Sequence, residues 1–181
     1  IFTEPYTDKL LPDLHPHGRD TITLVLDLED TLIYYVWNAE ESHWDPFKRP
    51  GASAFLEHLA QLYEIVVYAD EQSLHVDAVI NKVDVNHCIA HRLSRPATKY
   101  QNGKLFRDLS KLNRDEARVI YLSAYALENC LQHENCVQIK PCKKHDIDDT
   151  TLLDVRAVLQ SYQGLDIPTE FIRRSKEQQQ R

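Results

Sequence analysis

The stretch TITLVLDLEDTL, residues 21 to 32, decides the fold. It is β-branched and apolar as far as Leu26, which is typical of a strand buried on both faces of a parallel sheet. Asp27, Glu29 and Asp30 follow at once. Ligands bind in open α/β sheets outside the carboxyl ends of the strands, so these acidic residues mark the first place to look for a site.

Further strands and helices are predicted to alternate downstream of this stretch. KRPG places Pro50 in the first turn of a helix that carries Phe55, Leu56 and Leu59. The stretch through Trp37 and Trp44 is expected to be a connection, and Asn102-Gly103 predicts a β-hairpin. The alternation predicts one α/β domain. The other predicted segments are strands at 63–69, 118–124 and 135–140 and helices at 71–83 and 148–160.

The composition is that of a soluble globular chain, with 181 residues, 43% hydrophobic residues and a net charge of -7. The negative charge disfavours a nucleic-acid partner, although the segment from Arg92 to Arg118 is basic. The four cysteines form no C-x-x-C pair and are expected to be buried or indifferent thiols. His87, Cys88 and His91 lack a second ligand pair, so no metal site is predicted.

Several separated motifs occur in the order known from one superfamily: VLDLEDTL, KRPG, YEIVVYA, FRDLSKLNRD and IDDTTLLD. Together they resemble the carboxy-terminal-domain phosphatase branch of the haloacid dehalogenase superfamily. Within it, LPDLHP, YEIVVYAD, RPATKYQNGK and EFIRRSK are most similar to the plant-type Tim-fifty family, receptor subunits of the mitochondrial presequence translocase.

This resemblance implies a Rossmann-like parallel sheet flanked by helices, with a protruding β-hairpin and no large cap domain. It divides the chain into a lead-in at 1–20, a phosphatase-like domain at 21–164 with its hairpin at about 96–108, and a helical tail at 165–181. Relatives carry a longer segment after Asp154, so the chain is expected to lack about one helix there.

The resemblance also assigns roles to the residues around the first strand. Asp27 stands at the position of the phosphatase nucleophile, but Glu29 replaces the acid/base aspartate and Ala69 the phosphate-binding Ser or Thr. Arg107 replaces a lysine, and Ser123 a magnesium-binding aspartate. Losing these groups removes preorganised transition-state stabilisation. We therefore expect a degenerate phosphatase without a metal or another cofactor.

A receptor for presequences is the function that the resemblance implies. Presequences are basic and amphipathic, so a receptor needs acidic side chains beside an apolar groove. The candidates at the sheet edge are Asp27, Glu29, Asp30, Asp70 and Glu71, whose charges are expected to be uncompensated. Candidates for contact with the channel subunit lie in and after the hairpin: Lys99, Asn102, Gly103, Lys104, Asp108, Leu109 and Leu112.

The expected location is the intermembrane-space side of the mitochondrial inner membrane, reached through an anchor outside this sequence or through partner subunits. Two other functions stay open: a structural scaffold in an organellar membrane assembly, and a magnesium-dependent phosphoserine phosphatase supported by Asp27, Thr31 and the fold. The acidic residues are equally well explained as a solvated edge, and Leu109 and Leu112 as core residues.

Overall fold

A five-stranded parallel sheet forms the centre of the computed structural model, which describes residues 4–18, 20–162 and 166–180. The strand order is β5-β4-β1-β8-β9, and Leu24 of β1 pairs with Ile65 on one side and Ile120 on the other. β1 and β8 are buried along their whole length, as the apolar runs predict. The strands are β1 (Thr23–Leu26), β4 (Glu64–Tyr68), β5 (His91–Leu93), β8 (Val119–Ser123) and β9 (Cys136–Gln138).

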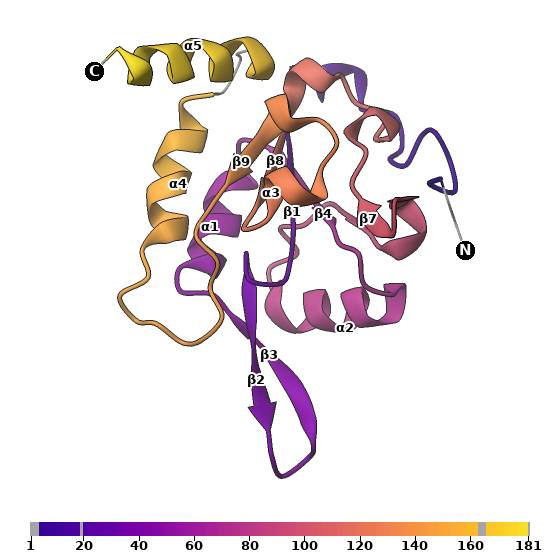
Figure 1. Cartoon of the computed structure of the whole chain (residues 1–181), viewed down its shortest axis with the longest axis vertical. Helices are drawn as coiled ribbons and strands as arrows, with labels where there is room; N and C mark the ends of the chain where they lie inside the picture. The colour runs from indigo at the N-terminus through magenta and orange to yellow at the C-terminus, as the bar shows by residue number, and fades with distance from the viewer. Residues whose placement is uncertain (1–3, 19, 163–165, 181) are drawn as a thin grey trace.

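Helices cover the sheet and confirm the predicted class of fold (Figure 1). α1 and α4 contact each other, and α1 buries Phe55, Leu56 and Leu59. The helices are α1 (Ala52–Leu59), α2 (Ser73–Val83), α3 (Ala126–Asn129), α4 (Thr151–Gln160) and α5 (Ile167–Gln179). Short 3-10 turns are η1 (Pro16–Gly18), η2 (Arg95–Ala97), η3 (Leu109–Lys111), η4 (Glu116–Arg118) and η5 (His133–Asn135).

The start of α1 differs from the prediction. The helix begins at Ala52, and Gly51 is its N-cap residue with a φ of 82°. Pro50 therefore precedes the helix instead of occupying its first turn. Glycine is suited to this N-cap because a residue without Cβ adopts positive φ without steric cost.

The buried apolar side chains form two clusters, and the N-terminal segment contributes to the second. This second apolar cluster contains Leu10, Leu11, Val25, Val66, Tyr68, Leu93, Ala97, Leu109, Leu112, Val119, Tyr121, Ala126 and Cys130. Leu10 and Leu11 are buried, and their amides donate to the carbonyl oxygens of Lys111 and Leu112 at 2.9 and 3.3 Å. These contacts attach the predicted lead-in to η3 and Leu112 through backbone hydrogen bonds and apolar burial.

Two β-hairpins form separate two-stranded sheets outside the central sheet. Only one of them was predicted from the sequence. β2 (Ile33–Asn38) and β3 (His43–Lys48) form an antiparallel pair that projects from the body of the molecule (Figure 1). The expected connection through Trp37 and Trp44 is therefore a pair of strands, and the prediction is corrected here. β6 (Lys99–Gln101) and β7 (Lys104–Phe106) form the predicted Asn102-Gly103 hairpin, but the projecting hairpin is β2–β3.

None of the helices within the described ranges combines the length and the apolar character that crossing a bilayer requires.

Candidate functional site

The carboxyl ends of β1, β4 and β8 meet around Asp27, the first residue after β1. Asp27 is buried, and both of its carboxylate oxygens are occupied. Oδ1 accepts hydrogen bonds from Arg107 Nη2 at 3.0 Å and from the Leu28 amide at 2.9 Å, and Oδ2 accepts one from Ser123 Oγ at 3.0 Å. The expectation of an uncompensated charge at Asp27 is therefore wrong, because Arg107 neutralises it inside the protein.

Arg107 is held in place by its backbone and its side chain. Its amide donates to the Asn129 carbonyl at 2.7 Å, and its carbonyl accepts from the Leu131 amide at 3.1 Å. Its guanidinium is 1% exposed and also donates from Nε to the Tyr68 carbonyl at 3.1 Å. Burial raises the pKa of Asp27, and the positive charge of Arg107 opposes that rise. The two residues form a buried ion pair at the place where the resemblance assigns a nucleophile and a lysine.

The arrangement does not fit a divalent metal ion. The cation that Asp27 contacts is the Arg107 guanidinium, and Ser123 contributes a hydroxyl where a second carboxylate is needed. Magnesium sites use carboxylate and water oxygens in near-octahedral geometry. Among the residues that the structure describes, no three His, Cys, Asp or Glu side chains are grouped to hold a metal ion.

Asp30 is another of the five predicted acidic residues whose charge is compensated, because it forms an ion pair with Lys143. It adopts a positive φ of 60°, which places its carboxylate beneath Tyr125 and Lys143. Oδ2 accepts from the Tyr125 hydroxyl at 2.5 Å and from Lys143 Nζ at 3.0 Å. Asp30 is only 7% exposed, and the neighbouring Thr31 accepts from the Ala124 amide through Oγ1.

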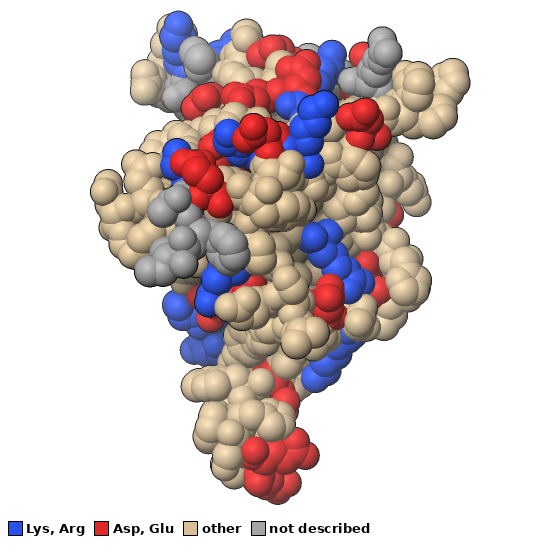
Figure 2. Space-filling view, turned by 90° about the vertical axis from the view of Figure 1, so that its right-hand side faces the viewer, with Lys and Arg blue, Asp and Glu red and all other residues tan. Residues whose placement is uncertain are grey.

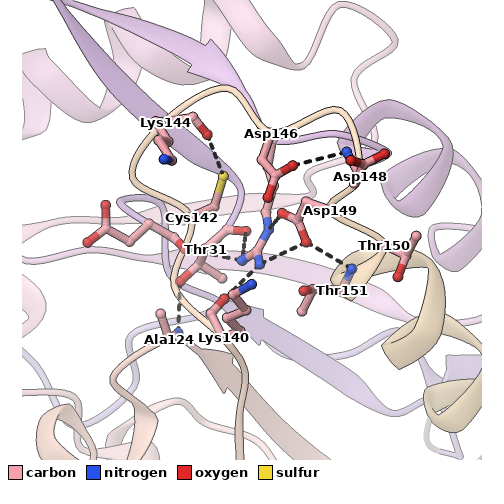
Figure 3. A network of polar contacts seen from close by, with 12 residues as sticks. Thr31, Ala124, Lys140, Cys142, Lys144, Asp146, Asp148, Asp149, Thr150 and Thr151 are labelled. Atoms are coloured by element: carbon pink, nitrogen blue, oxygen red, sulfur yellow. Dashed lines mark hydrogen bonds and ion pairs between the residues drawn. The ribbon is translucent and has the colours of Figure 1, made fainter.

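The buried Arg49 side chain joins the loop after β1 to the segment before α4. Figure 3 shows Thr31, Lys140 and Asp149 of these segments lying close together. Arg49 Nε donates to Asp149 Oδ2 at 2.8 Å, and Nη2 donates to the Lys140 carbonyl at 2.7 Å. Nη1 donates to the carbonyl oxygens of Asp30 and Thr31 at 3.2 and 3.3 Å. These contacts, called the Arg49 clamp below, hold together three segments that are far apart in the sequence: residues 30–31, Lys140 and Asp149.

The remaining three acidic candidates lie at the accessible edge. Glu29 is exposed, and the Asp70 side chain is 45% exposed with Oδ2 at 3.6 Å from Arg107 Nη1. Glu71 is partly buried, and its Oε2 has no hydrogen-bond partner among the described residues. Burial, together with the charge of Asp70, raises the pKa of Glu71 to about 7. Uncompensated acidity is thus concentrated at Glu29 and Glu71.

These two residues line a pocket between the β2–β3 hairpin and α2. It has a volume of about 420 Å³. Tyr35 and Trp44 contribute aromatic surface to the pocket. The Tyr35 hydroxyl and Nε2 of His75 on α2 share a hydrogen bond of 2.8 Å. The full lining is Glu29, Asp30, Tyr35, Trp44, Glu71, His75 and Lys143.

The hairpin itself carries aromatic and acidic side chains into solvent. Trp37 and Trp44 pair across the strands with ring centroids 5.4 Å apart, and they are 48% and 61% exposed. Glu40 and Glu41 lie in the exposed turn, and the tip of the projection is acidic (Figure 2). No candidate residue was predicted here, although the aromatic runs IYYVW and HWDPF favour strands.

The candidates for partner contact in the second hairpin are partly accessible. Asn102 and Gly103 form its exposed turn with φ values of 52° and 78°. Lys99 lies 3.5 Å from Glu4, and Lys104 lies over the Phe106 ring. These four positions are compatible with contact by another protein.

The other three candidates after this hairpin are structural. Leu109 and Leu112 are 0% exposed in the second apolar cluster, so neither side chain is available to a partner. Asp108 is buried and caps η3, where it accepts from the Ser110 amide at 3.1 Å and from Gln132 Nε2 at 2.8 Å. Their burial favours the alternative of core packing for Leu109 and Leu112, and a structural role for Asp108, over contact with a partner.

The parallel sheet and the aspartate after β1 define a phosphatase-type domain of the haloacid dehalogenase class. The crystallised RNA polymerase II CTD phosphatase Fcp1 has this fold, with a TM-score of 0.54 and 16% identity over 81% of this chain and 51% of that chain. The chain belongs to the NLI interacting factor-like phosphatase family, whose model matches residues 22–167.

The predicted resemblance to Tim-fifty proteins is confirmed. The chain is 50% identical to the mitochondrial import inner membrane translocase subunit TIM50 of Arabidopsis thaliana, over 99% of this chain and 51% of that protein. The TIM50 proteins of Phytophthora infestans and Emericella nidulans are 40% and 37% identical, over 92% and 99% of this chain and 42% and 36% of theirs. This chain therefore spans about half or less of the length of these relatives.

The alignment with the Arabidopsis protein extends over 195 positions, more than the 181 residues of this chain. That relative thus has residues without a counterpart here.

Proposed function

We propose that this domain is a catalytically degenerate phosphatase that serves as the receptor subunit of the mitochondrial presequence translocase. It recognises basic presequences on the intermembrane-space side of the inner membrane and passes preproteins to the channel. The observation that carries the proposal is the aromatic and acidic pocket beside an Asp27 that is already neutralised by Arg107. The relatives named as inner-membrane translocase subunits support the same role.

The pocket has the chemistry that a basic amphipathic helix requires. Glu29 and Glu71 offer carboxylates to a lysine or arginine side chain, and charge-assisted hydrogen bonds are stronger than neutral ones. The faces of Tyr35 and Trp44 attract a cation and also accept apolar side chains from the same helix. Asp27 and Asp30 stabilise the floor of the pocket instead of binding the peptide, and Asp70 contributes at the rim.

Phosphoryl transfer has little support at this site. A nucleophilic carboxylate must approach phosphorus freely, whereas both oxygens of Asp27 accept hydrogen bonds from protein groups. Ala69 supplies no hydroxyl, and its amide donates to the Leu93 carbonyl at 2.9 Å within the sheet.

Contact with the channel subunit is assigned to the accessible part of the β6–β7 hairpin, namely Lys99, Asn102, Gly103 and Lys104. The two lysines beside this exposed turn suit an acidic segment of a partner. Attachment to the membrane occurs through a segment outside this chain or through partner subunits.

A titration of a fluorescently labelled presequence peptide tests the receptor role. We expect saturable binding that weakens at least tenfold when Glu29→Gln and Glu71→Gln are combined, because both carboxylates are then lost. The matched control combines Glu57→Gln on α1 with Asp154→Asn on α4. Both variants are compared at pH 8, where Glu71 is largely ionised, so that each removes two negative charges. This control is expected to bind almost normally.

Two results would overturn the proposal. Failure of the unchanged domain to bind the peptide, with stable association to translocase subunits, would favour the scaffold function. Magnesium-dependent hydrolysis of a phosphoserine peptide that Asp27→Asn abolishes would instead establish a phosphatase.

A further inference from the structure

Two of the four cysteines lie at the two ends of the loop that joins α3 to β9. Cys130 is the C-cap residue of α3, and Cys136 is the first residue of β9. Cys130 Sγ donates to the Gln132 carbonyl at 3.8 Å, and Cys136 Sγ donates to the same oxygen at 3.4 Å. The two thiols therefore converge on one atom, within the second apolar cluster.

The surroundings of the other two cysteines are different. Cys142 Sγ donates to the Lys144 carbonyl at 3.3 Å in the loop before α4, and Cys88 lies after α2. Cys130 is buried, whereas Cys136 is partly exposed and open to a reagent from solvent. Contact with the Cys130 thiol, together with burial, raises the pKa of Cys136.

We infer that Cys130 and Cys136 form an intramolecular disulfide when the folded chain meets a disulfide oxidant such as oxidised glutathione. The Cys136 thiolate attacks one sulfur of the oxidant, and one glutathione thiolate leaves. The Cys130 thiolate then attacks Cys136 Sγ, and the second glutathione leaves. The two thiol protons end on the glutathione thiolates, and the two electrons reduce one oxidised glutathione to two molecules of reduced glutathione.

This disulfide closes the loop that holds the backbone of Arg107. The Leu131 amide donates to the Arg107 carbonyl, and the Arg107 amide donates to the Asn129 carbonyl. α5 contacts η5, which lies within the same loop. A covalent link restricts the unfolded chain and the local opening of this loop, so oxidation is expected to stabilise the folded domain. The inference stands independently of the receptor role.

The test uses a Cys88→Ser/Cys142→Ser variant that retains only the pair. The folded variant is incubated with oxidised and reduced glutathione and digested without reduction for mass spectrometry. We expect a peptide that links Cys130 to Cys136, a monomeric protein, loss of both free thiols and a higher Tm. Oxidation is expected to speed up with rising pH, because the thiolate is the nucleophile. Adding Cys136→Ser to the variant is expected to remove the link and the rise in Tm.

The inference is overturned if the pair stays reduced in the folded variant while the same chain oxidises in denaturant. It is equally overturned if the disulfide in the unchanged chain joins Cys88 to Cys142 instead of Cys130 to Cys136, or if the disulfides form between chains. A folded variant that stays reduced at every pH from ~7 to ~9 also overturns the inference.

Discussion

At the scale of single residues, the pair of Arg107 and Asp27 explains why a phosphatase-type sheet here presents no free nucleophile. Both side chains are almost fully buried, with 1% and 7% exposure. Removing one member of a buried ion pair leaves the other charge without compensation, and this typically costs about 3–5 kcal/mol. The stability of the domain is thus tied to the ion pair at the end of β1.

We expect Arg107→Met to lower the free energy of unfolding by about 3–5 kcal/mol at neutral pH, measured by urea denaturation. Combining it with Asp27→Ala is expected to cost much less than the sum of the two single changes, because no buried charge remains. Additive effects in this double-mutant cycle would contradict the proposed pairing.

Glu71 is an acidic residue whose titration falls in the physiological range. Burial raises its pKa to about 7, well above the ordinary value for glutamate. The folded state therefore holds this proton more tightly than the unfolded state, so stability falls as pH rises from about 4 to about 7.

We expect Glu71→Gln to increase the stability of the domain above pH 7, by on the order of 1 kcal/mol, because the uncompensated charge is removed. The same change is expected to flatten the rise in peptide affinity that accompanies ionisation of Glu71 between pH 6 and pH 8. Thermal unfolding and anisotropy titrations across this range measure both effects. A variant that loses stability above pH 7 would show that Glu71 has a partner in the folded protein.

At the scale of secondary structure elements, the Arg49 clamp joins the start of α4 to the loop after β1 (Figure 3). Burial opposes ionisation of Asp149, but the hydrogen bonds from Arg49 and Thr151 and the charge of Arg49 together outweigh it and lower the pKa of Asp149 to about 2. The contribution of this pair to stability is therefore complete above about pH 4 and is lost as pH falls toward 2.

Asp149→Asn is expected to destabilise the domain by about 3–5 kcal/mol at pH 7, because Arg49 then keeps a buried charge without its carboxylate. The gap between the variant and the unchanged protein is expected to narrow as pH falls below 4, where Asp149 of the unchanged protein takes up a proton. Denaturation curves at several pH values measure the gap. A gap that stays constant down to pH 2 would contradict the role of the charge.

The central sheet could be predicted from sequence because strands buried on both faces carry continuous apolar runs, as in TLVL of β1. The β2–β3 hairpin could not be recognised in this way. Its residues are largely exposed, Pro46 lies within β3, and its turn lacks the Asn-Gly or Asp-Gly signal. Aromatic enrichment was the remaining signal.

The sequence predicts where the candidate site lies, but not which of its carboxylates are paired. The order of the strands brings Asp27, Asp70 and Ser123 to one edge, as the positions of these residues at or just after the ends of their strands predict. Which carboxylates are free depends on partners from other elements, such as Arg107 after β7 and Lys143 in the loop before α4. A pattern of residue types contains no information on such pairings between distant segments.

At the scale of the whole molecule, the net charge of -7 attracts a basic peptide before contact is made. Such steering acts on the association rate and weakens with ionic strength, because the Debye length falls from about 10 Å at 0.1 M salt to about 3 Å at 1 M. Contacts within the pocket act mainly on the dissociation rate instead.

The two doubly neutralised variants separate these contributions in stopped-flow measurements. At pH 8, where Glu71 is largely ionised, each removes two negative charges, so at low salt both are expected to slow peptide association by a similar, modest factor, and this difference is expected to disappear as salt is added. Only Glu29→Gln/Glu71→Gln is expected to speed dissociation, by about tenfold, because only these carboxylates contact the bound cation. Equal dissociation rates for this variant and the Glu57→Gln/Asp154→Asn control would mean that the long-range field, and not the pocket beside the hairpin, accounts for peptide capture.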